Sequence, residues 1–483
     1  MARTLPRQVD VLVIGNGPSA LILSYILHGH IPIYDLANPH PDPILHEKLK
    51  HTRDLLSLNI DELTQHFPAS RFSYSTQALP VNVLYDTLIR PYGDTEDNKT
   101  CVKWTWDPAR AIPHVVVGDT TQPGGQWVGN PVHSSWSIGT LSYARMLSLP
   151  GYSFDQFFRE AFDCDLPFAS RPSRRDVADY LARYADKVGI ADSIVNGVYL
   201  SGIRRHGNGF YVSSHGIRCE QLVLASGIFG ALNPTRSLLQ PLTILPSSPQ
   251  VLTDSRLLVV GSGFTAADVI ISTHPGQKIL HIFKWDPSNH PSPLRSCHQD
   301  AYPEYAGVYR RMKTAALSLQ LPLDTKPRPR PHRRMSMFDK SREWDANYEG
   351  LPNTEIIGID LKDNCSRALV RLQNDEGEIF ERSVSSFAYV VGRHGTVDFL
   401  EHDLLDEMHL QQGQPISART FRHAAQEALE VAKRVFVIGS LTGDSLIRFS
   451  YGSCFSVAGN LLKGWSRQAE TQSVADTTHK DQL

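Results

Sequence analysis

Two segments of the chain, Val9–Leu27 and Arg256–Ser272, repeat one pattern: an apolar run, a glycine-rich turn and a stretch rich in small residues. The apolar run is typical of a buried strand, and the stretch after the turn is typical of a helix. A strand that enters a helix through a glycine-rich turn is the unit that binds mononucleotides. The repetition therefore predicts two such units in one chain.

The first copy contains a GxGxxA turn. Val11-Leu-Val-Ile14 leads into Gly15-Asn-Gly-Pro-Ser-Ala20, the context that the dinucleotide fingerprint requires. The first glycine permits a tight turn, the second lets backbone amides approach a pyrophosphate, and the alanine allows the helix to lie close to the sheet. The helix N-terminus adds N–H groups and the positive end of its dipole. The predicted cofactor contacts are Gly15, Gly17, Pro18, Ser19 and Ala20.

Asp35 follows Gly15 by about the twenty residues at which an acidic side chain normally binds a ribose hydroxyl. It is the candidate for the adenosine ribose. A solvated loop carboxylate beside Asn38 is an equally good interpretation.

The second copy, Leu257-Leu-Val-Val260 followed by Gly261-Ser-Gly-Phe-Thr-Ala266, repeats the fingerprint and predicts a second dinucleotide. Gly261, Gly263, Phe264 and Thr265 are its candidate contacts. The next predicted strand, Ile279–Phe283, ends at Lys284, where the first unit has Asp35. A cation suits a 2′-phosphate, so NADP(H) is favoured over NAD(H), although Lys284 is also compatible with an ordinary surface lysine.

Several further segments are candidate cofactor contacts. Leu222-Val-Leu-Ala-Ser-Gly227 resembles the strand that closes the first unit, where small residues allow close approach of a cofactor. Asp444 follows a predicted strand at Val435–Gly439, at the entry to a predicted helix at Ser453–Leu462, and an N-cap without any ligand is the simpler interpretation. Gly124-Gly-Gln-Trp127 adds a glycine pair that allows close approach, followed by a large aromatic ring, but from the residues alone it is only a turn. With Ser142, the further candidates are Gly124, Gly125, Gln126, Trp127, Ala225, Gly227, Asp444 and Arg448.

Composition narrows the class of protein. The chain has 483 residues, enough for two or three domains, and its acidic and basic side chains nearly cancel, so nucleic acid is an unexpected partner. The apolar runs are too short to span a bilayer. The six cysteines show no CxxC spacing, which disfavours a thioredoxin-reductase-type mechanism. The opening residues lack the pattern of a secretory signal, so we expect the protein to be located in the cytosol.

The predicted architecture is α/β, with two nested Rossmann-like dinucleotide-binding domains. The first part of the FAD-binding domain spans residues 1–232, a linker spans 233–250, the inserted NADPH-binding domain spans 251–384, the return segment of the FAD-binding domain spans 385–466, and a frayed polar tail spans 467–483. A helix is expected at Arg174–Val188, and the proline-rich stretch Pro322–Arg334 is expected to be a surface loop.

The assembled motifs resemble those of the flavin-containing monooxygenase superfamily. That likeness rests on the paired fingerprints, on Gly124-Gly-Gln-Trp127, and on Ala225-Ser-Gly227, where serine replaces the usual threonine. Within it the chain resembles the oxidative-stress-induced growth inhibitor family. The blocks that carry this narrower likeness are Gly15-Asn-Gly-Pro-Ser19, Asp86-Thr-Leu-Ile-Arg-Pro91, Ala111-Ile-Pro-His114 with Pro123-Gly-Gly125, Tyr302-Pro-Glu-Tyr305, and Gly443-Asp444 with Arg448-Phe449.

The resemblance implies FAD in the first fold, with Gly124, Gly125 and Trp127 beside the flavin and Asp444 on its ribityl-pyrophosphate side. The implied reaction is oxygenation of a small organic substrate by dioxygen, through a flavin hydroperoxide formed after NADPH reduces FAD. Such chemistry belongs to the cofactor, so no catalytic side chain and no metal ligand set is assigned, and His114 and His133 are interpreted as packed or surface residues. Two alternatives stay open: a flavin-binding stress or growth regulator without turnover, and an NADPH oxidase-like protein that releases peroxide.

Overall fold

The computed structural model describes residues 5–72, 74–93, 99–132, 134–247, 256–318, 338, 342–427 and 429–480, with only the backbone described for 427 and 466–480. His133 and the stretch Pro322–Arg334 lie outside these residues.

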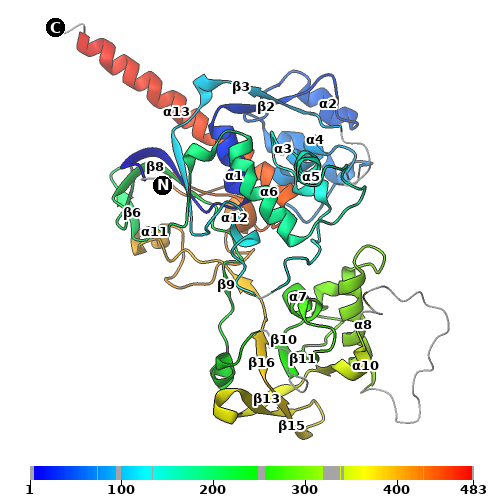
Figure 1. Cartoon of the computed structure of the whole chain (residues 1–483). Coiled ribbons are helices and arrows are strands. Elements are labelled where there is room, and N and C mark those ends of the chain that lie inside the picture. Colours follow the sequence, from blue (N-terminus) through cyan, green and yellow to red (C-terminus); the bar gives the residue numbers. More distant parts are fainter. Residues whose placement is uncertain are drawn as a thin grey trace. The chain divides into compact units, whose positions relative to one another are not determined.

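The described part of the chain contains both helices and strands (Figure 1). The α-helices are α1 (Pro18–Leu27), α2 (Pro43–Leu49), α3 (Ile60–Thr64), α4 (Pro80–Ile89), α5 (Phe154–Phe162), α6 (Arg174–Lys187), α7 (Phe264–Ser272), α8 (Pro303–Ser318), α10 (Trp344–Asn347), α11 (His402–Glu407), α12 (Arg422–Glu427) and α13 (Ser450–Lys480). The strands are β1 (Gln8–Ile14), β2 (His30–Tyr34), β3 (Val102–Trp106), β4 (His114–Gly118), β5 (Ile194–Asn196), β6 (Ile203–His206), β7 (Gly209–Val212), β8 (Ile217–Leu224), β9 (Ala231–Leu232), β10 (Arg256–Val260), β11 (Lys278–Phe283), β12 (Tyr348–Pro352), β13 (Glu355–Lys362), β14 (Arg367–Gln373), β15 (Ile379–Val384), β16 (Ser386–Tyr389), β17 (Arg393–His394), β18 (Glu430–Ala432) and β19 (Val435–Val437).

The chain divides into two compact units. Unit 1 comprises Met1–Gly129, Ser142–Gly230 and His394–Leu483, and unit 2 comprises Asn130–Leu141 and Ala231–Arg393. The NADPH-binding domain predicted from the sequence ends at residue 384, just before β16. In the structure β16 pairs with β10, and unit 2 continues to Arg393.

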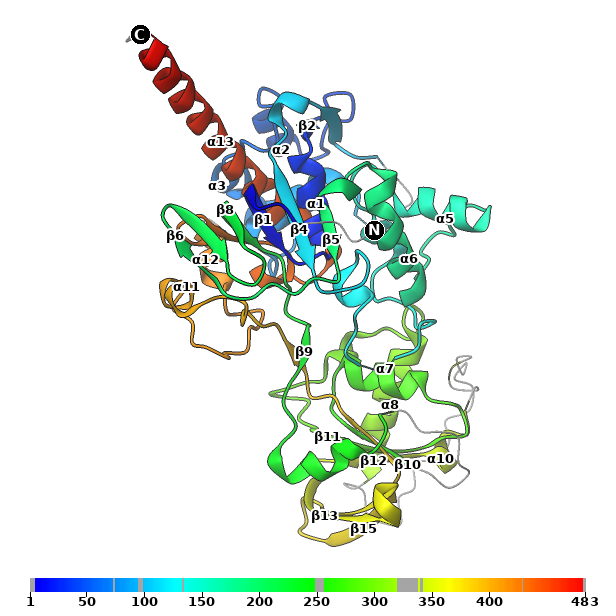
Figure 2. The same cartoon turned by 60° about the vertical axis from the view of Figure 1, so that its left-hand side comes forward.

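Unit 1 is built on a sheet with strand order β18-β19-β8-β1-β4-β5. The five strands from β19 to β5 run parallel, and Figure 2 shows β8, β1, β4 and β5 side by side. Both faces of this sheet are covered. Val11 and Val13 of β1 belong to the apolar cluster that also contains α1, α4 and α13, whereas Leu12 and Ile14 belong to a second cluster on the opposite face. Burial on both faces explains why β1 reads as a continuous apolar run.

Unit 2 contains a parallel sheet of strand order β12-β11-β10-β16 and a separate antiparallel sheet of order β13-β14-β15. Alternate residues of β10 again face opposite sides. Leu257 and Val259 pack with residues of α7 and α8, while Leu258 packs with Val370 and Leu372 of the antiparallel sheet. The parallel sheet of unit 2 is therefore enclosed by helices on one face and by a second sheet on the other.

The local predictions agree with the structure at each glycine turn, where β1 leads into α1 and β10 leads into α7, and at α6, which begins after a capping box between Ser173 and Asp176. The end of the chain differs. The backbone of α13 is helical as far as Lys480, past the point at which composition predicted a frayed tail.

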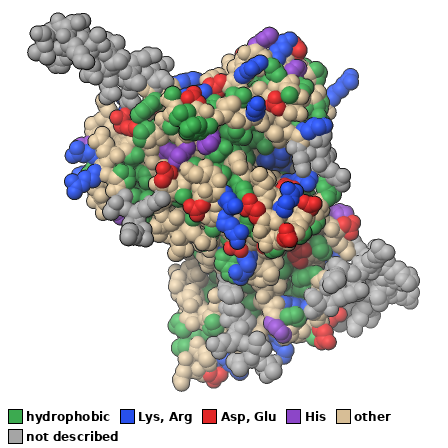
Figure 3. Space-filling view, turned by 45° about the horizontal axis from the view of Figure 1, so that its top comes forward, with side chains coloured by type: hydrophobic (Ala, Val, Ile, Leu, Met, Phe, Trp, Pro, Cys, Tyr) green, Lys and Arg blue, Asp and Glu red, His purple; other side chains and the backbone are tan. Residues whose placement is uncertain are grey.

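No described helix is long and apolar enough to cross a membrane. On the face drawn in Figure 3, Lys and Arg side chains lie among Asp and Glu side chains, as the near-zero net charge predicts.

Candidate cofactor-binding sites

Gly15 is required by the packing of unit 1. Its φ is +111°, and a Cβ at this position would lie 2.4 Å from the carbonyl oxygen of Ala225. Its own N–H donates to the carbonyl of Val117 at 2.7 Å, which fixes the turn between β4 and the end of β8. Any other residue would be strained in conformation and would collide with backbone, so this glycine has a structural cause independent of a ligand.

Neither backbone conformation nor packing requires a glycine at Gly17. Its backbone is extended, with φ −78° and ψ −179°, a conformation that any residue adopts. A Cβ here would meet no described heavy atom within 4 Å. Gly17 also forms the N-cap of α1, where no side chain caps the first N–H groups. A glycine that the fold does not need, beside uncapped amides at a helix N-terminus, fits a site for a phosphate group.

The structure brings the Gly124–Gly125 pair to this turn. The N–H of Gly124 donates to the carbonyl of Asn16 at 2.9 Å, and a Cβ on Gly125 would lie 3.1 Å from the Cα of Gly17. Asn16 itself is buried, and its amide donates to Asn196 at 2.7 Å. Two segments predicted to contact the same cofactor therefore lie together, about 100 positions apart in sequence.

The segment after β19 also reaches the first turn. A Cβ on Gly439 would lie 2.3 Å from the Ser19 hydroxyl, and that hydroxyl donates to Ser450 at 3.0 Å. Ser440 accepts from the N–H of Ile228, the residue that follows Gly227. The sequence interpretation missed Ser440 and Ser450. A signal for Ser440 was available, because it lies shortly after the buried strand β19 (Val435–Val437), whereas the sequence contains none for Ser450.

The remaining predicted contacts of unit 1 are partly buried. Gln126 and Trp127 lie in the short 3₁₀ helix Gly125–Trp127. The Trp127 side chain packs against the apolar cluster that contains α1, α4 and α13, and its carbonyl accepts a hydrogen bond from buried Arg174 at 3.3 Å. Ser142 lies just before the 3₁₀ helix Ala144–Leu147.

Asp35 follows β2 directly, as predicted. One carboxylate oxygen accepts from the N–H of Ala37 at 3.0 Å, and the other accepts from the Asn38 amide at 2.7 Å. These bonds, that of Asn38 first, hold the pKa of Asp35 below its ordinary value. The carboxylate is locally fixed at the end of β2, which pairs with β3 in a separate two-stranded sheet, whereas the strands beside β1 are β4 and β8. Asp35 therefore does not end a strand next to β1, where the fingerprint places the ribose-binding acid, and its contacts with Ala37 and Asn38 favour the loop-carboxylate interpretation.

Asp444 and Arg448 bind α4. Buried Asp444 accepts from the N–H of Leu79 at 2.8 Å, from the Asn82 amide at 2.7 Å, and from Arg422 at 2.6 Å. Asp444 does not cap the helix that follows it, because α13 begins only at Ser450. The contacts observed for Asp444 therefore fasten the return segment to the start of α4.

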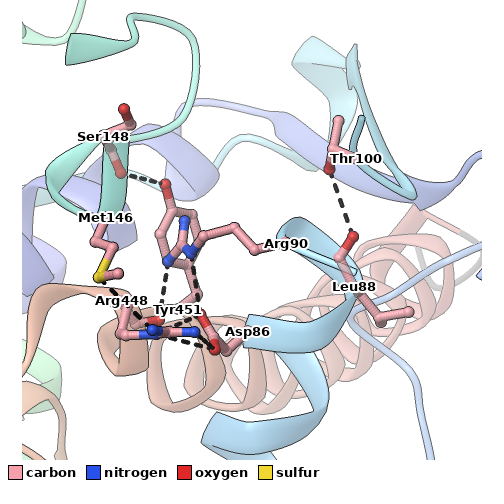
Figure 4. Close-up of polar contacts among 8 residues, drawn as sticks. All are labelled: Asp86, Leu88, Arg90, Thr100, Met146, Ser148, Arg448 and Tyr451. Atoms are coloured by element: carbon pink, nitrogen blue, oxygen red, sulfur yellow. Dashed lines mark hydrogen bonds and ion pairs between the residues drawn. The ribbon is translucent and has the colours of Figure 1, made fainter. Parts of the chain in front are cut away.

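Arg448 forms the second attachment to α4. Its guanidinium donates to Asp86 at 2.6 Å, and Asp86 also accepts from Arg90 at 3.1 Å (Figure 4). The Arg90 guanidinium lies 5.7 Å from the centre of the Tyr451 ring, and Tyr451 donates to the carbonyl of Ser148. Asn82 and Asp86 lie four residues apart on α4, and Arg90 directly follows its last residue, so these three residues present a largely buried polar stripe to the return segment.

The second turn reproduces the geometry of the first. Gly261 has φ +149°, and a Cβ would lie 2.4 Å from the carbonyl oxygen of Val390. Gly263 has φ −104° and ψ −171°, caps α7 without a side-chain bond, and has no described heavy atom within 4 Å of a Cβ. Phe264 and Thr265 are partly buried at the start of α7, where the Phe264 ring packs edge-on against Tyr305. Unit 2 thus offers a second turn that fits a phosphate group.

Lys284 is exposed and follows β11 directly, the position predicted from the sequence. Among the described residues, no group of three or more His, Cys, Asp or Glu is arranged to hold a metal ion. His114 is buried and bonded to the Ser24 hydroxyl at 2.8 Å, which confirms that it is a packed residue.

These sites belong to a fold that recurs in solved flavoproteins. A bacillithiol disulfide reductase from Staphylococcus aureus is similar over 95% of this chain and 99% of its own, with a TM-score of 0.53 and 10% identity. A double mutant of a flavin monooxygenase from Stenotrophomonas maltophilia is similar over 94% and 98%, with a TM-score of 0.50 and 13% identity. The class that the fold defines is a mixed α/β protein with parallel sheets, similar to FAD/NAD(P)-binding flavoproteins.

No family model matches the chain. Its curated homologues are oxidative stress-induced growth inhibitors. The mouse protein named oxidative stress-induced growth inhibitor 1 is 26% identical over 95% of this chain and 96% of its own length. The family resemblance carried by the sequence motifs is thereby confirmed.

Proposed function

We propose that the chain is an FAD-dependent oxidoreductase that takes electrons from NADPH. The observation that carries this proposal is the matched pair of turns, in which the second glycine of each fingerprint, Gly17 or Gly263, is required neither by backbone conformation nor by packing. A close-approaching diphosphate explains both glycines at once. The likeness of the fold to solved flavoproteins supports the same conclusion.

In this proposal unit 1 is a discontinuous FAD-binding domain and unit 2 is an inserted NADPH-binding domain. Gly15 shapes the first turn, and Gly17, Pro18, Ser19 and Ala20 hold the FAD diphosphate at the N-terminus of α1. The second turn and Lys284 hold NADPH in the same manner, with the lysine near the 2′-phosphate. FAD, when bound, supplies the redox chemistry by accepting a hydride and passing electrons to dioxygen.

The chain's own residues bind, orient and exclude water. The Gly124–Trp127 segment is held to the first turn by the bond from Gly124 to Asn16, so it lies where a cofactor on that turn is within reach. Ala225 lies against Gly15 and Gly439 lies against Ser19, so the closing strand and the return segment both reach the same turn. Ser440 joins these two segments near Gly227, where it accepts from the N–H of Ile228. We assign these residues to the enclosure of the flavin, from which they would exclude water.

The reaction we favour is monooxygenation. One substrate molecule, one dioxygen, one NADPH and one proton give the oxygenated substrate, water and NADP⁺, so one oxygen atom enters the substrate and the other leaves as water. Disulfide reduction by a cysteine pair is less well supported, because the six cysteines show no CxxC spacing and form no disulfide in the described part of the chain.

A second candidate rests on the homologues, whose name describes growth inhibition. In this alternative the chain is a flavin-binding regulatory protein that acts through partners and has no turnover. The intact second turn favours the enzyme, because a protein that needs only FAD gains little from a nicotinamide-nucleotide site.

Rapid mixing of the reduced, full-length protein with dioxygen tests the proposal. A delay before the oxidised flavin spectrum returns, with hydrogen peroxide released only as that spectrum returns, supports oxygenation. Immediate return with one peroxide per NADPH indicates an oxidase. Bound flavin that NADPH never reduces indicates the regulatory alternative, and a protein that binds no flavin contradicts the proposal altogether.

A further inference from the structure

A buried histidine contacts the second glycine turn. His281 lies within β11, the strand between β10 and β12, and its side chain is fully buried. Its Nε2 atom lies 2.7 Å from the carbonyl oxygen of Gly261, and its Nδ1 atom lies 2.8 Å from the hydroxyl of Tyr348 on β12. Three adjacent strands are thus joined by side chains at the point where the fingerprint begins.

The chemistry of the partners fixes the direction of both hydrogen bonds made by His281. A carbonyl only accepts, so Nε2 carries the hydrogen and Nδ1 accepts from Tyr348. Burial lowers the pKa of His281 to about 4 and raises the pKa of the Tyr348 hydroxyl, so the imidazole is neutral and the phenol keeps its hydrogen. A neutral imidazole has one donor and one acceptor, which is what this position requires.

The neighbouring peptide of the turn is held as well. The hydroxyl of Ser292 donates to the carbonyl of Ser262 at 2.6 Å. Both peptide bonds are trans, and in a planar trans peptide the carbonyl and the next N–H point in opposite directions. Fixing the carbonyls of Gly261 and Ser262 therefore fixes the directions of the N–H groups of Ser262 and Gly263, on the opposite side of the turn.

We propose that His281, held by Tyr348, and Ser292 are positioning residues that direct the Ser262 and Gly263 amides toward the diphosphate of the nicotinamide nucleotide. The inference rests on the proposed function and adds to it. The residues that fix the diphosphate site are a histidine from the interior of the sheet and a serine from the loop after β11, and neither belongs to the glycine fingerprint.

The test measures affinity of the full-length, FAD-loaded protein for two probes. NADP⁺ contains the diphosphate, whereas adenosine 2′-monophosphate contains the adenine and the 2′-phosphate without it. Ser292→Ala and Tyr348→Phe are the mild variants, and His281→Leu is the severe one. His281→Gln restores a donor and an acceptor and serves as the rescue. Thr354→Val, which removes a buried hydroxyl that donates to the Pro352 carbonyl in the same unit, is the matched control.

We expect Ser292→Ala and Tyr348→Phe to weaken NADP⁺ binding by about five- to tenfold. His281→Leu should weaken NADP⁺ binding further, and His281→Gln should bind NADP⁺ about as tightly as the wild type. Binding of adenosine 2′-monophosphate, the FAD content and the control variant should change by less than about twofold. Unchanged NADP⁺ affinity in the folded mild variants, or an equal loss for both probes, would overturn the inference while leaving the proposed function intact. A wild-type protein that binds FAD but neither probe would overturn both.

Discussion

The guanidinium of Arg448 donates to the carboxylate of Asp86 at 2.6 Å, although the two residues are 362 positions apart in the sequence. Both side chains are largely buried, with exposed fractions of 18% and 10%. Asp86 lies on α4 and Arg448 lies in the return segment that contacts Ser19 of the first turn. The ion pair therefore joins a helix near the beginning of the chain to the segment that closes the candidate FAD site.

Replacement of Asp86 by asparagine removes the charge that two arginines share. We expect Asp86→Asn to lower the free energy of unfolding by about 2–4 kcal/mol, because Arg90 and Arg448 remain in a largely buried environment. Urea denaturation followed by circular dichroism measures the change. Glu381→Gln breaks the exposed pair with Arg371 and should cost at most about 1 kcal/mol. Equal effects of the two substitutions would contradict the role given to Asp86.

Alanine at the two glycines of the first turn should produce opposite phenotypes. Gly15→Ala forces a positive φ on alanine and a collision with the Ala225 carbonyl, so we expect a loss of about 3 kcal/mol or more in stability. Gly17→Ala meets open space in an extended conformation, so its stability should stay within about 1 kcal/mol while FAD affinity falls by about tenfold or more. Thermal unfolding and flavin content distinguish the two. A folded Gly17→Ala protein with full flavin content would argue against a diphosphate at this turn.

Stability should decrease in mild acid. Burial lowers the pKa of His40, His114 and His281 to about 4, whereas a histidine in the unfolded chain titrates near its ordinary value of about 6.5. Between these values the unfolded chain binds protons that the folded chain does not. The stabilisation is therefore complete above about pH 6.5 and is lost as the pH falls toward about 4.

The pH dependence can be assigned to single residues. Urea midpoints measured from about pH 7 to about pH 5 should fall, and His114→Gln, which keeps a donor and an acceptor, should make the dependence shallower. A midpoint independent of pH over this range would show that these histidines are not buried in the neutral form.

Lys284 determines the choice of nucleotide in the proposed function. Lys284→Glu replaces the cation by an anion at the end of β11, so we expect the KM for NADPH to rise by about tenfold or more while the KM for NADH changes little. Steady-state flavin reduction with each nucleotide measures the ratio. If both KM values rise together, Lys284 does not read the 2′-phosphate.

Local sequence patterns predicted the elements that local interactions determine. The turns at Gly15 and Gly261 were recognisable because each is set by short-range constraints: an apolar strand, a glycine forced to positive φ, and a helix of small residues. In the structure, the Gly124–Gly125 pair, a predicted cofactor contact, also lies at the first turn.

Long-range polar contacts were not predictable in this way. The stripe formed by Asn82, Asp86 and Arg90 resembles an exposed helix face in the sequence, and its burial depends on partners more than 350 positions later. Asp444 was expected at a helix entry, and only the folded chain shows that α4 supplies its partners. His281 lies in an apolar strand, and its contact with Gly261 follows only from the pairing of β10 with β11.

Anaerobic titration with NADPH tests most directly the claim that two glycine turns hold two different nucleotides. We expect the wild-type protein to bind one FAD, NADPH to bleach the absorbance of that flavin, and Gly263→Ala to retain the flavin but to require about tenfold more NADPH for the same rate of reduction. A wild-type protein that takes up no flavin, or a Gly263→Ala variant reduced as readily as wild type, would contradict it.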